Sequence, residues 1–187
     1  DGLIEILNSP NIVGDMTLNS GSGNITTRGN TVTGHTDITT AGDITSNNNI
    51  YETVTFNSQG DFSKKVESSG DTITGVDPSG TVAAIFDATD ANVSINNINV
   101  KQGSLAVTTK DGGINLLYGT NPSARNSIAT DMTLRSTNGG GIKSINADVG
   151  GHAKIETSGN IISNNSAYET LNIISTGGSD KIVESID

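Results

Sequence analysis

Apolar residues recur about every six positions in the first quarter of the chain. Ile25, Val32, Ile38, Ile44 and Ile50 stand seven, six, six and six residues apart. Each of the first four is followed by Thr and then by a Gly, Asn or Asp turn. An α-helix cannot keep this spacing on one face, whereas strands of about two to four residues joined by tight turns can. The pattern predicts short β-strands, with Gly and Asn at turns that tolerate positive φ.

The same pattern returns in the second half of the chain. Residues 37–68 align without a gap onto residues 154–185, and 16 of those 32 positions are identical. A unit of about 115 residues therefore occurs once in full, over residues 1–110, and once cut short, over residues 111–187. Such repetition favours an extended array over a compact enzyme. The chain begins without Met and the second copy is incomplete, so we expect a fragment of a longer repetitive protein.

Elsewhere the pattern predicts longer strands and little helix. The expected strands are Tyr51–Asn57, Thr81–Phe86, Ala91–Val100 with a slip at Asn96 and Asn97, Leu105–Thr109 and Ile114–Leu117. Pro122–Leu134 is a candidate for a short helix or a loop, because Asn121 could cap it. Phe62–Ser68 and Ser179–Ser185 are weaker helix candidates. The fold class is therefore all-β.

Composition adds an expectation about assembly. Only 32% of residues are hydrophobic, and 22 Ile and 11 Val stand against 8 Leu. The β-branched residues favour strands. Because one chain has so little apolar surface, we expect it to build only a thin core, which identical neighbours would complete. The sequence thus predicts an elongated, repetitive fibrous β-structure in the form of an intertwined homotrimer.

Charge and cysteine content exclude several classes of protein. The net charge is −10 and the ten Lys and Arg residues are scattered, so we expect no nucleic-acid binding. The absence of Cys excludes disulfides and thiolate zinc sites. No segment approaches 18 apolar residues, so we expect no membrane insertion.

Histidines and acidic residues give weak signals of chemistry. His35 and His152 occupy the same place in the two copies, which allows a metal site, but each stands alone, which favours a polar side chain at a turn. Asp87 and Asp90, with Asp71 and Asp77 nearby, could form a carboxylate pair for glycoside hydrolysis or a calcium loop. The full calcium-loop spacing is missing, and charges on solvated strand edges explain these residues better.

Three further features favour structural roles. Tyr51 and Tyr168 are repeat mates, each followed by Glu-Thr, and the three Phe and three Tyr are too few for a sugar-stacking groove. The segment Asn138–Gly141 lacks the Lys-Ser/Thr of a phosphate-binding loop, so it is interpreted as a turn. We therefore predict no catalytic, cofactor-binding or metal-binding residues, no cofactor and no enzymatic activity.

One motif resembles a known family. Residues 69–75 (SGDTITG) resemble the Ser-Gly-Asp-Thr-Met-Thr-Gly repeat of many bacteriophage tail-fibre proteins, with Ile73 where that family usually has Met. Residues 37–50 and 80–100 are also similar to fibre shaft sequences. The resemblance implies a homotrimeric β-structured rod on the outside of a virion, which supports attachment to the bacterial host surface. Its implied partners are itself, other tail-fibre or virion proteins and a bacterial surface receptor; it offers no catalytic residues.

Two other classes compete with the tail fibre. The segments GNITT (residues 23–27) and TAGDI (residues 40–44) also resemble secreted bacterial surface adhesins such as filamentous haemagglutinins. That resemblance implies a monomeric parallel β-helix with coils of about 20 residues. A tailspike-like glycanase would need an aromatic groove and clustered carboxylates, which the sequence does not indicate.

Overall fold

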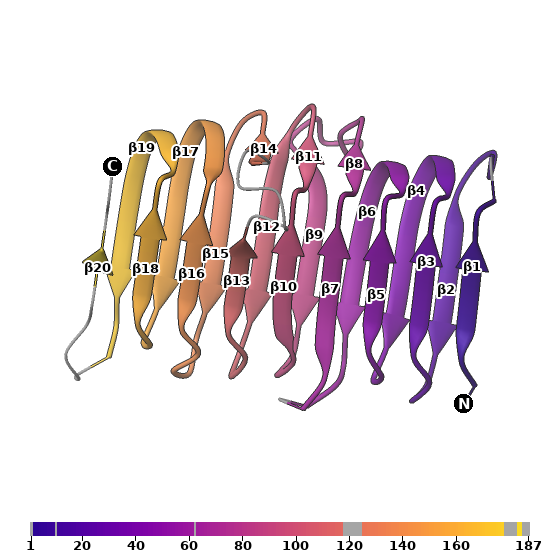
Figure 1. Cartoon of the computed structure of the whole chain (residues 1–187), viewed down its shortest axis with the longest axis horizontal. Helices are drawn as coiled ribbons and strands as arrows, with labels where there is room; N and C mark the ends of the chain where they lie inside the picture. The colour runs from indigo at the N-terminus through magenta and orange to yellow at the C-terminus, as the bar shows by residue number, and fades with distance from the viewer. Residues whose placement is uncertain (1, 10, 62, 118–124, 178–182, 185–187) are drawn as a thin grey trace.

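The computed structural model describes residues 2–9, 11–61, 63–117, 125–177 and 183–184. Within these residues the chain contains β-strands and no helix, so the all-β prediction is confirmed. The strands form a parallel β-solenoid of about eight turns, whose coils stack along the long axis (Figure 1). Since no described segment is helical, none is a helix that could cross a membrane.

Two parallel sheets run the length of the solenoid. The first has nine strands, which are β1 (Ile4–Leu7), β3 (Ile25–Arg28), β5 (Ile44–Asn47), β7 (Lys65–Ser69), β10 (Asn92–Asn96), β13 (Ile114–Leu117), β16 (Ile142–Ile145), β18 (Ile161–Asn164) and β20 (Val183–Glu184). The second has eleven strands, which are β2 (Met16–Ser20), β4 (Thr31–Thr40), β6 (Ile50–Ser58), β8 (Thr72–Ile73), β9 (Val82–Ala88), β11 (Asn99–Val100), β12 (Ser104–Thr109), β14 (Asn126–Ile128), β15 (Met132–Ser136), β17 (Ala147–Thr157) and β19 (Ala167–Ser175).

The second sheet bends at a corner, which gives each coil three sides. The register between β4 and β6 shifts between Val32 and His35, and the register between β17 and β19 shifts between Val149 and His152. In the middle coils the same path is divided in two: β8 pairs with the start of β6, and β9 pairs with its end. A coil therefore consists of one strand in the first sheet, one short strand and one longer strand.

The six-residue period is the length of one side of a coil. Ile25, Val32 and Ile38 are all buried, and each comes from a different side of the same coil. Ile44 begins the next coil and pairs with Ile25. Because the strands are parallel and in register, equivalent residues of successive coils lie next to each other, in strands about 4.8 Å apart. One row of the first sheet is β-branched throughout: Ile4, Ile25, Ile44, Val66, Val93, Ile114, Ile142 and Ile161.

The hexad prediction is wrong at Ile50. Its side chain is 44% exposed, while Tyr51 beside it is fully buried. The corner residue Asn48, with a φ of 52°, is equivalent to Gly29 in the previous coil, so the next buried residue stands seven positions after Ile44, at Tyr51, as Val32 stands seven after Ile25. A slip of one residue exchanges the inward and outward faces of a strand.

A single chain covers its own apolar stripe throughout the described part of the solenoid. Each coil is walled by the coil before it and the coil after it, so a narrow apolar stripe suffices for a continuous core. Phe56 and Phe86 lie at the centre of this core on adjacent coils, with ring centroids 4.7 Å apart. The coils close within a single chain over all of the described residues, and no intertwining of chains is needed to bury them.

Hydroxyl groups and glycines hold the turns that lead back to the first sheet. The Thr40 hydroxyl donates to the Gly23 carbonyl of the previous coil (2.6 Å) and accepts from the Gly42 amide (2.9 Å). Thr157 makes the same pair of hydrogen bonds one repeat later. A Cβ at Gly140 would lie 1.9 Å from the Gly112 carbonyl oxygen of the previous coil. The recurrent Thr-x-Gly text is therefore the sequence of a tightly stacked turn.

Asparagine and glycine form the corner between the first sheet and the short strand. The corner residues with positive φ, between 47° and 70°, are Asn8, Gly29, Asn48, Gly70, Asn97, Asn146 and Asn165. At the corners formed by Gly29, Asn48 and Gly70 the next residue, Asn30, Asn49 or Asp71, accepts a hydrogen bond from a backbone amide of the previous coil. Asn30 Oδ1 accepts from the Ser9 amide (2.9 Å), and Asn49 Oδ1 accepts from the Asn30 amide (3.0 Å). The Asn-rich text thus satisfies backbone groups that the corner would otherwise leave unpaired.

The sequence repeat is an exact multiple of the coil. β16 and β18 begin 117 residues after β3 and β5 respectively, which corresponds to five coils. Residues 1–110 and 111–187 share both sheets, since β12 pairs with β15 across the boundary. The predicted repeat units are therefore consecutive parts of one stack.

The helix candidates are strands wherever the structure describes them. The candidate for a short helix or loop, Pro122–Leu134, overlaps β14 (Asn126–Ile128) and the start of β15 (Met132–Ser136), and its residues 122–124 lie outside the described residues. Lys65–Ser69 is β7, in place of the weaker candidate Phe62–Ser68. Most of Ser179–Ser185 lies outside the described residues. The local capping signals do not produce a helix here, because strand pairing with the neighbouring coils overrides local propensity. The other predicted strands are confirmed, including the slip at Asn97.

Candidate functional site

The two histidines lie at equivalent corners. Both side chains are exposed, and Nδ1 of His35 bonds to the Thr53 hydroxyl of the next coil (2.8 Å). The backbone amide of His35 donates to Asp15 Oδ1 (2.8 Å). His152 has the same environment one repeat later, with Thr170 and Asp131. Among the described residues no group of three or more His, Asp or Glu side chains could hold a metal ion.

The four acidic candidates are spread over different settings. Asp87 points outward from β9, and Asp90 lies in the following turn with Lys110 Nζ 3.8 Å from its Oδ1. Asp77 accepts hydrogen bonds from the Ser79 hydroxyl and from two backbone amides of its own loop. Asp71 is buried inside the solenoid. The structure does not assemble the Asp87 and Asp90 carboxylates with the other two.

Tyr51 and Tyr168 anchor hydroxyl clusters inside the coils. The Tyr51 hydroxyl bonds to Thr27 (2.9 Å) and Ser46 (3.0 Å), and its burial raises the pKa of the phenol. The Tyr168 hydroxyl bonds to Ser144 and Ser163, each at 3.1 Å. The corresponding inward positions of β10 and β13 are the apolar residues Ile95 and Leu116. Small hydroxyl residues thus occur where a Tyr enters the core and needs both space and a partner.

Asn30, Asn49 and Asp71 form a row of side chains at the same corner of successive coils, and Asp71 is the last of the three. Its Oδ1 accepts from the Asn49 amide (2.8 Å) and from Asn49 Nδ2 (3.2 Å), while Oδ2 accepts from the Ser68 hydroxyl (2.7 Å). A carboxylate only accepts hydrogen bonds, so it suits the last place in a row of donors; Ile98, at this position in the next coil, has no side-chain acceptor to offer. Burial raises the pKa of Asp71, against the opposing effect of the hydrogen bonds from Ser46, Ser68 and Asn49.

We predict a pH dependence of stability from Asp71. Just above the ordinary Asp pKa of about 3.9, the folded protein keeps a proton that the unfolded chain has lost. The free energy of unfolding of the wild type relative to Asp71→Asn should therefore fall as the pH rises through this window, then level off. Urea unfolding from about pH 3 to about pH 8 measures it.

Asp77→Asn is the matched control, with the opposite sign. Hydrogen bonds from Ser79 and from backbone amides hold the pKa of the exposed Asp77 below its usual range. The stabilisation that the ionised Asp77 contributes is therefore lost as the pH falls. The free energy of unfolding of the wild type relative to Asp77→Asn should rise as the pH rises. If the free energy of unfolding of the wild type rose with pH relative to both variants, the assignment for Asp71 would be contradicted.

Asn138–Gly141 is the turn between β15 and β16, as predicted. The Asn138 amide donates to the Lys110 carbonyl of the previous coil (2.7 Å), and Gly139 has a φ of 106°. The close approach of Gly140 to the neighbouring turn accounts for the glycine run. Nothing in this turn requires a phosphate to explain it.

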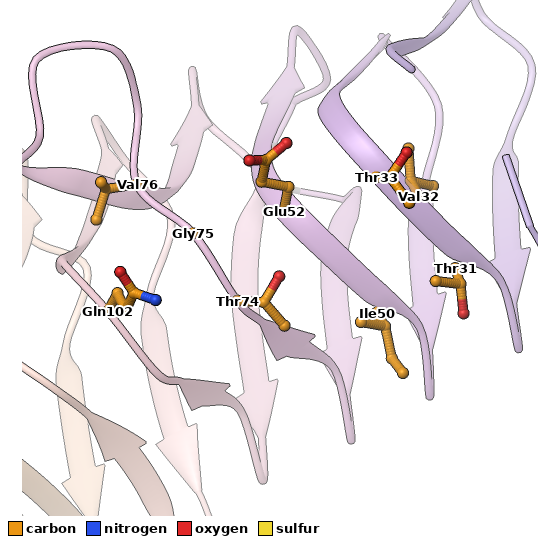
Figure 2. Close-up of a pocket in the computed structure, with 9 residues that line it drawn as sticks. All are labelled: Thr31, Val32, Thr33, Ile50, Glu52, Thr74, Gly75, Val76 and Gln102. Atoms are coloured by element: carbon orange, nitrogen blue, oxygen red, sulfur yellow. The ribbon is translucent and has the colours of Figure 1, made fainter. Parts of the chain in front are cut away.

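A loop between β8 and β9 borders a hollow on the outer surface. Residues 74–81 connect β8 to β9, whereas β11 and β12, and likewise β14 and β15, are joined by three residues at the equivalent corner. Asp77 braces this loop, and the Gly75 amide donates to the Glu52 carbonyl (2.8 Å). The hollow beside it has a volume of about 460 Å³ (Figure 2). A second hollow of about 340 Å³ shares Glu52 and Val76 with it and adds Asp15 and His35.

The larger hollow combines aliphatic side chains with unused polar groups. Figure 2 shows Glu52 flanked by Val32 and Thr33 of β4 on one side and by Val76 and Gln102 on the other. Among the described residues, the Glu52 carboxylate and the Gln102 amide have no hydrogen-bonding or ionic partner. The lining contains no basic side chain.

No family model matches this chain, and neither a curated protein nor a solved structure matches it.

Sequence reasoning missed Glu52 and Gln102. Glu52 follows the buried Tyr51 and carries no motif, and Gln102 lies 50 positions further along the chain. The one available signal was the turn text Asp77-Pro78-Ser79-Gly80, which indicated the loop. The sequence could not show which residues the loop would face.

Proposed function

We propose that this chain is a structural segment of the rod of an extracellular attachment protein, with no catalytic role. The observation that carries the proposal is the unbroken pair of parallel sheets through every described coil. Hydrogen bonds between coils run along the rod axis and resist bending and stretching. With about 4.8 Å per coil, about eight coils span about 40 Å. The segment supplies reach and stiffness.

The first candidate is the rod of a secreted bacterial surface adhesin. The supporting observation is that one chain closes each coil and supplies its own core. Equivalent residues from Ile25 to Ile161 stand 19 to 28 residues apart, and four of the six spacings, between 19 and 22 residues, are close to the adhesin-type coil of about 20 residues. In this role the segment acts as a monomeric spacer.

The second candidate is a bacteriophage tail fibre, supported by the SGDTITG motif. Within the solenoid this motif forms a corner, with Gly70 at a φ of 70° and Asp71 buried. In this role the chain is part of a homotrimer on the virion, contacts other fibre proteins and supports binding to a bacterial receptor. Three solenoids would then associate through their outer faces, because their cores are already closed.

Light scattering on the purified chain separates the two candidates. A mass of one chain, with an unfolding midpoint independent of protein concentration, is expected for the adhesin rod. A mass of three chains, with a midpoint that rises with concentration, is expected for the fibre. Small-angle X-ray scattering on the same sample tests the rod itself: a compact or unfolded particle would exclude both candidates.

A further inference from the structure

The hollow beside the 74–81 loop has the composition of a site for a long-chain amine. We propose that it binds the side chain of a lysine on a partner polypeptide. This inference does not depend on whether the rod belongs to an adhesin or to a fibre.

The charge of the hollow selects a cation. Glu52 is exposed, and its carboxylate has no ionic or hydrogen-bonding partner among the described residues. The larger hollow contains no Lys, Arg or His, and the adjoining hollow adds the Asp15 carboxylate and the His35 imidazole but no Lys or Arg. The protein as a whole has a net charge of −10, which attracts cations to its surface.

The walls of the hollow select an aliphatic stem. Ile50, whose side chain is 44% exposed, and Val76 line it together with Glu52. A lysine side chain packs its methylene groups on apolar surface and keeps its ammonium in a polar environment. The Thr31 hydroxyl and the Gln102 amide also line the hollow and can accept hydrogen bonds from the ammonium.

An amino sugar fits this lining less well. Sugar rings stack on aromatic faces, and the lining contains no Phe, Tyr or Trp. The equivalent corners of the other described coils have no loop of this length, so they lack the second wall of the hollow. The 74–81 loop supplies that wall, and its Val76 methyl group lies so close to Gly103 that a Cβ there would be 2.5 Å away.

The chain contains a matched control for Glu52. Glu169 follows Tyr168 on β19 as Glu52 follows Tyr51 on β6, and it is exposed as well. No loop like 74–81 lies beside Glu169 among the described residues. Glu169→Gln therefore removes an equivalent charge without touching the hollow.

The test is a titration of the whole chain with N-acetyl-lysine methylamide, followed through the backbone amide signals of Gly75 and Gln102 by NMR. We expect saturable shifts at millimolar ligand that weaken as salt is added. Glu52→Gln should weaken binding about fivefold, as expected for one exposed ion pair, whereas Glu169→Gln should leave it unchanged.

Two further ligands complete the test. N-acetyl-norleucine methylamide keeps the aliphatic stem but has no ammonium group. Its affinity for the wild type should be no higher than the affinity of the lysine ligand for Glu52→Gln. Glucosamine should bind more weakly than the lysine ligand. Equal binding by wild type and Glu52→Gln, no saturable shifts, or tighter binding of glucosamine would each overturn the proposal.

Discussion

Phe86→Ala should lower the free energy of unfolding by about 3–5 kcal/mol. Phe86 is fully buried, and its ring lies 4.7 Å from that of Phe56 on the previous coil. Removing the ring leaves a cavity that cannot collapse, because the spacing of coils is fixed by the ladders of β9 with β6 and β12. Since small domains are stable by only about 5–15 kcal/mol, this is a large share of the total. Urea unfolding followed by circular dichroism measures the loss.

Ile85→Ala is the control for this substitution. Ile85 is next to Phe86 on β9 but points outward and is 37% exposed, so its truncation should cost less than about 1 kcal/mol. Should Phe86→Ala fail to fold, Phe86→Leu provides a milder cavity at the same place. Equal losses for Phe86 and Ile85 variants would contradict the assignment of the inward and outward faces.

Gly140→Ala should destabilise the protein by about 3 kcal/mol or more, at or above the usual range for overpacking. The added Cβ would lie 1.9 Å from the Gly112 carbonyl oxygen and 2.5 Å from the Ser136 hydroxyl oxygen. The first atom belongs to the turn of the previous coil and the second to the end of β15 in the same coil, so one methyl group must push two coils apart and displace the Ser136 side chain. The shift would also disturb the Gly140 carbonyl, which accepts from the Thr157 hydroxyl (2.6 Å).

Gly141→Ala tests whether the close approach, rather than the loss of a glycine, is responsible. A Cβ at Gly141 would lie 3.4 Å from the Asn160 carbonyl oxygen, an ordinary contact, so this substitution should change stability by less than about 0.5 kcal/mol. Hydrogen exchange gives a local measurement. The Ile142 amide, which donates to Asn160, should lose protection in Gly140→Ala and keep it in Gly141→Ala.

Residues at the same place in the two sequence copies occupy equivalent environments in the solenoid. The equivalence of Tyr51 with Tyr168 correctly indicated a structural role, because both hydroxyls bond to small residues inside the coil. The equivalence of His35 with His152 likewise predicted a common environment at a turn. The hollow at Glu52 has no counterpart in the sequence pattern, because its walls come from four successive coils.

The sequence by itself determined the local structure. β-branched residues at a period of six, with Gly and Asn at the corners, require short strands and tight turns whatever surrounds them. Only the tertiary structure decided how the apolar stripe is covered. The same stripe could face other chains on a common axis or face the next coil of its own chain, because hydrophobic burial is not directional. The register between coils settles this: Ile25 pairs with Ile44, and each turn of the chain becomes the wall of the next.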